Sequence, residues 1–164
     1  MISPLISLIQ EQVSTLINLG VPAAFLTSNC NERMKDSIYD DLGRVYGNRE
    51  PTLKLLYTTP ETLIKSERMK TMLGEMYGRD MIARFFIDEA HCVSSWGHDF
   101  RKEYGNLGIM KERYPEVKML ALTATARQKV ADDVCKVLDI RDSLRISCGY
   151  DRPNLLFEVR PKPR

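Results

Sequence analysis

The chain has 164 residues, a length that fits one domain with a sizeable core but not a motor of two lobes. Less than half of the residues are apolar, and we find neither a long hydrophobic run nor a signal-peptide pattern, which predicts an intracellular protein without a membrane segment. The net charge of +2 does not by itself indicate a nucleic-acid binder, so phosphate contacts must come from local groups and helix ends.

The cysteines are spread along the chain without a CxxC pair: Cys30, Cys92, Cys135 and Cys148. Only the two histidines, His91 and His98, could join them as soft ligands. We therefore predict reduced thiols and no zinc site in this segment.

The first half of the chain alternates helical and strand patterns. Ser3 and Pro4, followed by apolar residues at helical spacing, predict a helix over 4–18 with Ser3 as its N-cap. Gly20 to Pro22 ends it. The segments that follow are a buried strand, an exposed amphipathic helix, a second strand and an interrupted helical region, over 23–27, 32–46, 53–57 and 59–77.

The second half continues in the same way. A continuous apolar run over 82–87 predicts a buried parallel strand that ends at Asp88. A further strand, a helix and a short last strand are predicted over 117–122, 127–138 and 144–147, and the basic, proline-containing tail over 160–164 is typical of a linker. Such alternation predicts an α/β fold: a parallel sheet with helices on both faces, where ligands bind beyond the carboxyl ends of the strands.

The most informative pair of residues is Asp88-Glu89, directly after the predicted strand 82–87. A carboxylate at a strand end can hold Mg²⁺ directly or through water, and its neighbour can polarise a water for attack on a γ-phosphate. An isolated acidic pair is more often a solvated turn. The buried strand before it favours the chemical interpretation.

The sequence Asp88-Glu89-Ala90-His91, followed by CVSSWGHDFR over 92–101, resembles motif II and the aromatic-rich loop of RecQ DNA helicases. Members of the family often have Gln where Ser95 stands. Trp96, the only tryptophan, could instead be a core anchor with Phe100 nearby. The resemblance implies that this loop senses single-stranded DNA and couples it to ATP hydrolysis. The residues concerned are Trp96, His98, Asp99, Phe100 and Arg101.

Three further segments resemble RecQ motifs in the family's order. The ALTATA stretch over 121–126 is similar to motif III, which implies that Thr123 and Thr125 bridge the nucleotide and DNA sides; alone it would more often be a strand end with Thr125 as a helix cap. Motifs Ia and Ib are matched by ISPLISL over 2–8 and YTTPE over 57–61. They imply DNA phosphate contacts at helix N-termini, although by themselves they would be ordinary caps. The residues are Ser3, Pro4, Ser7, Tyr57, Thr59 and Pro60.

The resemblance extends over essentially the whole chain, because residues 150–155 are similar to the segment that leads into the second motor lobe. The stretches over 54–57 and 84–87 make Bloom-syndrome-type RecQ helicases the most similar group. It implies a RecA-like (P-loop NTPase) fold, truncated at the N-terminus: a partial ATP-binding domain over 1–147 and a connector over 148–164.

The family uses ATP and Mg²⁺, and the resemblance assigns Asp88 to Mg²⁺ through water, Glu89 to activation of the attacking water, and His91 to the link with the aromatic loop. A GxxxxGK[ST] phosphate loop is absent, since none of the nine glycines precedes a lysine. We therefore expect negligible ATPase activity from the chain alone. The missing strand should also leave apolar sheet edges unpaired and the chain marginally stable or prone to aggregate.

Two functions remain open from the sequence. The first is the first motor lobe of a nuclear, ATP-dependent 3′-to-5′ DNA helicase of repair and recombination, with single-stranded and duplex DNA as its partner. The second is a catalytically inactive module that binds DNA or a protein partner weakly. A DEAD- or DEAH-box RNA motor is disfavoured, because those families lack the WGHDFR segment over 96–101.

Overall fold

The computed structural model describes residues 1–43, 51–94, 100–125, 127–149, 152–156 and 158–159. Its sheet consists of four short parallel strands, in which apolar side chains alternate between the two faces. β1 pairs with β2 from Ala23↔Leu55 to Leu26↔Thr58, and β3 pairs with β4 from Arg84↔Lys118 to Ile87↔Ala121. The strands are β1 (Ala23–Leu26), β2 (Leu55–Thr58), β3 (Arg84–Ile87) and β4 (Lys118–Ala121).

Residue 2 joins the two pairs of strands, since Ile2 forms parallel bridges with both Thr58 and Ile87. Its N–H donates to the Phe86 carbonyl at 2.7 Å, and its own carbonyl accepts from the Asp88 N–H at 2.8 Å. On the other side, the Ser3 N–H donates to the Thr58 carbonyl at 3.0 Å. The order β1, β2, residue 2, β3, β4 is therefore continuous and parallel, as the sequence predicted.

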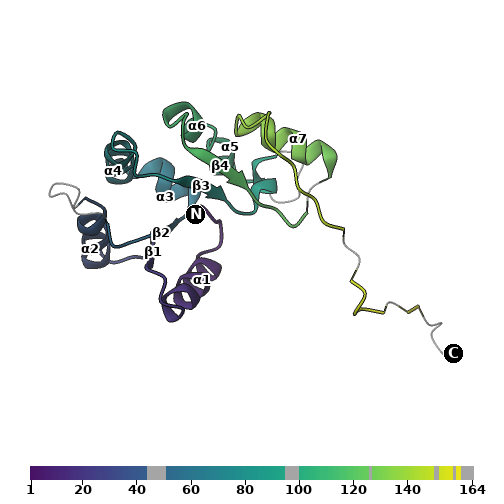
Figure 1. Cartoon of the computed structure of the whole chain (residues 1–164), viewed down its shortest axis with the longest axis horizontal. Helices are drawn as coiled ribbons and strands as arrows, with labels where there is room; N and C mark the ends of the chain where they lie inside the picture. The colour runs from purple at the N-terminus through teal and green to yellow at the C-terminus, as the bar shows by residue number, and fades with distance from the viewer. Residues whose placement is uncertain (44–50, 95–99, 126, 150–151, 157, 160–164) are drawn as a thin grey trace.

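The helix α1 (Ile6–Asn18) covers one face of β1 and β2. Ile9 and Val13 pack there against Ala23 and Tyr57 in a small buried cluster. Figure 1 shows α1 on the opposite side of these strands from α3 and α4. The predicted end of this helix is confirmed, because Gly20 follows it with a φ of +76°, a left-handed conformation that glycine adopts without steric cost.

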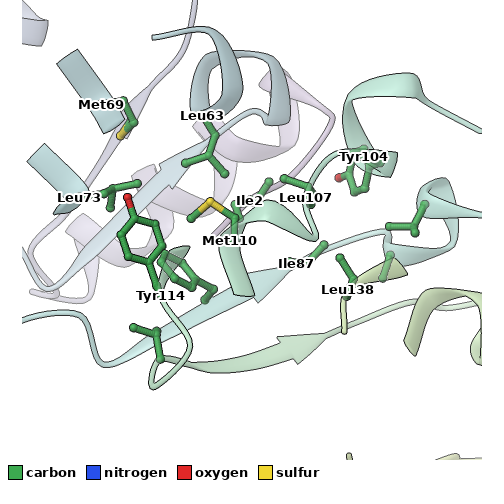
Figure 2. Close-up of a cluster of buried hydrophobic side chains, with 14 of the residues drawn as sticks. Ile2, Leu63, Met69, Leu73, Ile87, Tyr104, Leu107, Met110, Tyr114 and Leu138 are labelled. Carbon is green, nitrogen blue, oxygen red and sulfur yellow. The ribbon is translucent and has the colours of Figure 1, made fainter. Parts of the chain in front are cut away.

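The larger core lies on the other face of the sheet (Figure 2). Buried side chains of the strands and of the helices that pack on this face form it. In this core the ring of Tyr114 lies 5.2 Å from that of Tyr77 and 5.7 Å from that of Phe85, between ring centroids. The helices are α2 (Glu32–Gly43), α3 (Pro60–Lys65), α4 (Glu67–Tyr77), the 3₁₀ helix η2 (Ala90–Val93), α5 (Lys102–Gly105), α6 (Ile109–Arg113) and α7 (Gln128–Val137). Among the described residues, no helix is long and apolar enough to cross a membrane.

Two predictions about local structure were wrong. Ser3 is not the N-cap of α1; that position is Leu5, without a capping side chain, because the Ser3 backbone and hydroxyl are engaged inside the sheet. The predicted last strand over 144–147 has no regular structure. The apolar residues Leu144 and Ile146 alternate with polar residues, as is typical of a strand. Both side chains are almost fully exposed, however, and their segment pairs with no strand in the described part of the chain.

The short helices α5 and α6 were not predicted, because Gly105 and Gly108 interrupt the helical pattern there. Gly108 has a packing reason: a Cβ at this position would collide with the carbonyl oxygen of Val137 at the end of α7. The glycine therefore allows the α5–α6 segment to approach α7 closely.

The strand β4 is the last strand of the described sheet and pairs there only with β3. Two leucines next to this edge are unusually accessible, Leu120 at 45% and Leu122 at 39%. An apolar strand with an unpaired row of N–H and C=O groups is a template for association with another chain.

We predict that Leu120→Lys reduces self-association of the chain, because a charge beside the edge opposes strand addition. Ile17→Lys is the control, since Ile17 is also exposed, at 55%, but belongs to α1. Light scattering against protein concentration measures the effect. A monomeric elution profile and a cooperative thermal transition for the unchanged chain would contradict the expected instability.

Candidate active site

Asp88 directly follows β3, as predicted, and is fixed from three sides. Its N–H donates to the Ile2 carbonyl, and its carbonyl accepts from the Tyr104 hydroxyl at 2.9 Å. Its side chain accepts, at Oδ2, a hydrogen bond of 3.1 Å from the hydroxyl of Ser3. Ser3 is fully buried and Asp88 is half-buried, so water reaches this bond from the side of the carboxylate only. The carboxylate is thus oriented by a residue 85 positions earlier in the chain.

Tyr104 is a contributor to this site that the sequence did not indicate. Its side chain is fully buried on α5, and burial, with smaller contributions from Cys92 and Asp88, raises the pKa of its phenol. The hydroxyl therefore remains protonated and can donate to the Asp88 carbonyl. The only signal available was an aromatic residue three positions after Arg101, which is not specific.

Glu89 has a left-handed backbone conformation, with φ of 48° and ψ of 43°. For a residue with a Cβ this conformation costs roughly 1–2 kcal/mol relative to a right-handed one. Such strain persists only where surrounding contacts impose it, and it is concentrated at functional sites. Here the hydrogen bond from the Ala90 N–H to the Leu122 carbonyl, at 2.8 Å, holds the chain directly after Glu89 against the end of β4.

His91 connects the acidic pair to the segment after β4. Its Nδ1 lies 2.8 Å from the Thr123 hydroxyl and 3.2 Å from Glu89 Oε2. The Thr123 hydroxyl donates its own proton to the Thr125 carbonyl at 3.4 Å, so the geometry favours a proton on Nδ1. Thr123 and Thr125, predicted as bridging residues, are therefore linked to the acids; the N-cap of α7 is Arg127, not Thr125.

The aromatic loop is described only at its end, because Trp96, His98 and Asp99 lie outside the described residues. Phe100 is 51% exposed and is accessible to a ligand. Arg101 anchors this end: its N–H donates to the Cys92 carbonyl at 3.0 Å and its guanidinium to the Pro4 carbonyl at 3.3 Å. The loop is thus attached both to η2 after the acids and to the segment before α1.

Most of the predicted DNA contacts have buried side chains. Ser7 is exposed and Pro4 half-buried, whereas the other four lie in the interior: Ser3, Tyr57, Thr59 and Pro60. Thr59 caps α3 by accepting from the Thr62 N–H at 3.3 Å, the ordinary role that the sequence left open. The predicted phosphate contacts are made by backbone N–H groups at the helix N-termini rather than by these side chains, and they remain a prediction.

The acids fit a magnesium ion better than a metal held by protein alone. In the described part of the chain no three His, Cys, Asp or Glu residues are grouped as a metal site. Mg²⁺ retains waters and commonly takes only one or two carboxylates together with substrate phosphates. Asp88, oriented by Ser3 at the end of a strand, is suited to such water-mediated coordination.

A comparison with known families places this chain in a class of proteins. The family described as DEAD/DEAH box helicase matches residues 1–134. The chain belongs to this family, whose domain has a RecA-like fold.

Individual relatives narrow the class and confirm the resemblance to RecQ helicases. The chain is 42% identical to "RecQ-like DNA helicase BLM" of Xenopus laevis over 161 residues, 98% of this chain and 12% of that protein. It is 44% identical over 161 residues to "ATP-dependent DNA helicase Q-like 2" of Arabidopsis thaliana, and 38% identical over 162 residues to "ATP-dependent DNA helicase Q1" of Rattus norvegicus. These matches cover 98% and 99% of this chain, but only 22% and 25% of those proteins.

We predict that Ser3→Ala lowers the free energy of unfolding by about 1–2 kcal/mol, because it leaves the Asp88 carboxylate without a buried donor. Ser7→Ala is the control, since Ser7 is exposed and such surface changes usually stay within about 0.5 kcal/mol. Denaturant unfolding measures both. Equal effects of the two substitutions would show that the bond to Asp88 contributes nothing to stability.

We also predict that Glu89→Gly is more stable than Glu89→Ala by roughly 1 kcal/mol, because glycine relieves the left-handed strain. The matched position is Glu75, an exposed residue within α4. In a helix glycine is less stable than alanine by roughly 0.5–1 kcal/mol, so the order should be reversed there. Thermal unfolding of the four variants gives the comparison; the same order at both positions would refute the strain.

Proposed function

We propose that this chain is the first motor lobe of an ATP-dependent, 3′-to-5′ DNA helicase of the RecQ type, which acts in the nucleus in DNA repair and recombination. The observation that carries the proposal is the position of Asp88 and Glu89 at the end of β3, joined through His91 to Thr123. The similarity to proteins named RecQ-like or ATP-dependent DNA helicases supports DNA as the substrate and ATP as the nucleotide.

In this proposal Asp88 holds Mg²⁺ through water, and Glu89 orients and polarises the water that attacks the γ-phosphate. When bound, Mg²⁺ neutralises negative charge on the phosphates. The buried hydroxyl of Ser3 fixes the direction of the Asp88 carboxylate, and His91 shares its Nδ1 proton between Glu89 and Thr123. A shift of Thr123, in the segment after β4, would therefore also move His91, which contacts Glu89, the proposed general base.

We propose that the aromatic loop couples DNA binding to the position of Asp88 and Glu89. Its described end, Arg101, contacts both Cys92 and Pro4, and Phe100 next to it is exposed for stacking on a base. Trp96, His98 and Asp99 are assigned to the same role by the resemblance alone. Pro4 and Ser7 are the remaining accessible members of the predicted motif Ia contact.

A second candidate is a module that binds DNA without turnover. The absence of a GxxxxGK[ST] loop from these 164 residues favours it for the chain by itself. In the same way, the connector over 148–164 and the partial domain over 1–147 remain a proposal about how the chain fits into a larger motor.

The enzymatic role is tested in a polypeptide that joins this chain to a phosphate-loop segment and a second lobe. We expect Glu89→Gln to lower DNA-stimulated ATP hydrolysis by about 10²–10⁴-fold, since general-base contributions have that size, while nucleotide binding is kept. Glu75→Gln is the control, because Glu75 is an exposed residue of α4. Undiminished hydrolysis by the Glu89 variant would exclude its role as the base.

The 164-residue chain itself distinguishes the two candidates. We expect it to bind labelled single-stranded DNA with an affinity that falls as salt rises, and to hydrolyse no ATP. Fluorescence anisotropy at several salt concentrations and a phosphate-release assay measure the two properties. ATP hydrolysis by the pure chain would show that turnover does not require a GxxxxGK[ST] loop. A lack of DNA binding would exclude the second candidate, the DNA-binding module.

A further inference from the structure

The backbone of Glu89 is held on both sides by hydrogen bonds from distant parts of the chain. The hydroxyl of Tyr104, on α5, donates to the carbonyl of Asp88 at 2.9 Å, and this carbonyl belongs to the peptide group before Glu89. The N–H of Ala90, in the peptide group after Glu89, donates to the carbonyl of Leu122 at 2.8 Å. The first bond restricts rotation about φ of Glu89, and the second restricts rotation about ψ.

These two angles decide where the Glu89 carboxylate lies. In an extended strand neighbouring side chains point to opposite faces of the sheet, so continued extension after β3 would direct Glu89 away from Asp88. The left-handed conformation of Glu89, with φ of 48° and ψ of 43°, ends this alternation. Its Oε2 lies 3.2 Å from Nδ1 of His91 in this conformation. A residue that fixes φ of Glu89 therefore also fixes the direction of the proposed general base.

We propose that Tyr104 is a positioning residue for ATP hydrolysis: its hydroxyl holds the peptide group between Asp88 and Glu89 in the orientation that directs the Glu89 carboxylate at the attacking water. The inference rests on the proposed function, in which Glu89 is the general base, and adds a residue to it. Tyr104 is fully buried, so it contacts no ligand and acts only through the backbone that it holds.

The ring of Tyr104 is itself fixed by packing. It belongs to the larger core, together with Ile87 and Leu107, which are equally inaccessible (Figure 2). An exposed donor would lose rotational freedom on forming such a bond, whereas the packing of the core has already removed that freedom from Tyr104. Burial also raises the pKa of its phenol, so the hydroxyl keeps the proton that it donates. The bond to the Asp88 carbonyl is therefore suited to hold the backbone in one orientation.

ATP hydrolysis by the polypeptide that joins this chain to a phosphate-loop segment and a second lobe tests the inference. We expect Tyr104→Phe, which removes the hydroxyl and keeps the ring, to lower kcat about 5–20-fold and to change KM for ATP less than about twofold. A misdirected base slows the chemical step, whereas the contacts that bind the nucleotide are kept.

Tyr114→Phe is the matched control. Tyr114 is buried in the same core, where its ring contacts Tyr77 and Phe85, and Figure 2 shows it well apart from Tyr104. Loss of its hydroxyl should leave kcat unchanged. A kcat for the Tyr104 variant equal to that of the Tyr114 variant would overturn the proposal.

A double substitution separates positioning from a general loss of structure. If Tyr104 acts through Glu89, Tyr104→Phe causes no further loss in a polypeptide that already carries Glu89→Gln, because the base that it positions is gone. Single-turnover measurements, made well below the thermal transition of each variant, give the low residual rates. The same fold-loss in both backgrounds would show that Tyr104 only stabilises the lobe and would overturn the proposal.

The 164-residue chain provides a test that needs no ATP. Glycine at position 89 is expected to be more stable than alanine, and we expect Tyr104→Phe to reduce this difference by about half or more, since residue 89 can then leave the left-handed conformation. Tyr114→Phe should leave the difference unchanged. Thermal unfolding of the variants measures it; an undiminished difference with Tyr104→Phe would show that the hydroxyl does not hold the backbone of Glu89.

The outcomes separate this inference from the proposed function. If Glu89→Gln abolishes hydrolysis but Tyr104→Phe leaves kcat unchanged, Tyr104 is excluded as a positioning residue and the proposed base stands. If Glu89→Gln leaves hydrolysis undiminished, the proposed base fails and the role of Tyr104 in hydrolysis fails with it. Loss of kcat in the Tyr104 variant, absent from the Glu89→Gln background, supports both.

Discussion

The structure depends on residues 1–3, which lie between β2 and β3 and hydrogen-bond to both. Successive residues of an extended segment direct their backbone groups alternately to opposite sides. Here the Ile2 N–H and carbonyl bond with β3 and Asp88, while the Ser3 N–H bonds with β2. Without this segment the two strand pairs would share no backbone hydrogen bonds in the described sheet. Two of its residues are also nearly inaccessible, since Ile2 is 2% and Ser3 0% exposed.

The same segment determines the geometry of the acidic pair. A carboxylate at a strand end is free to turn unless a neighbour restricts it, and the Ser3 hydroxyl provides that restriction for Asp88. Tyr104 holds the Asp88 carbonyl from the side of the larger core, and contacts with β4 fix the chain after Glu89. The strained conformation of Glu89 lies between these fixed points. The position of the acids is therefore a property of the assembled sheet rather than of the local sequence.

Much of the fold could be predicted from hydrophobic periodicity, because buried strands and amphipathic helices have distinct repeats. Asp88 at the end of β3 could be predicted for the same reason. The local sequence pattern could not show which segments pair with one another in the sheet, or which side chains distant in sequence form hydrogen bonds. Leu144 and Ile146 have the alternation of a strand, but no partner lies beside them in the described residues. Ser3 matched a helix cap, yet its hydroxyl bonds a residue far along the chain, as does that of Tyr104.

Because the strands are parallel, their carboxyl ends lie along one edge, and this places the acids after β3 and the segments that follow β1 and β2 on the same edge. Residues 2–4 lie between them, with backbone bonds to both halves and with the Arg101 contact at Pro4. A ligand that moves β2 must therefore strain the hydrogen bond of Ser3 to Thr58, and Ser3 also holds Asp88.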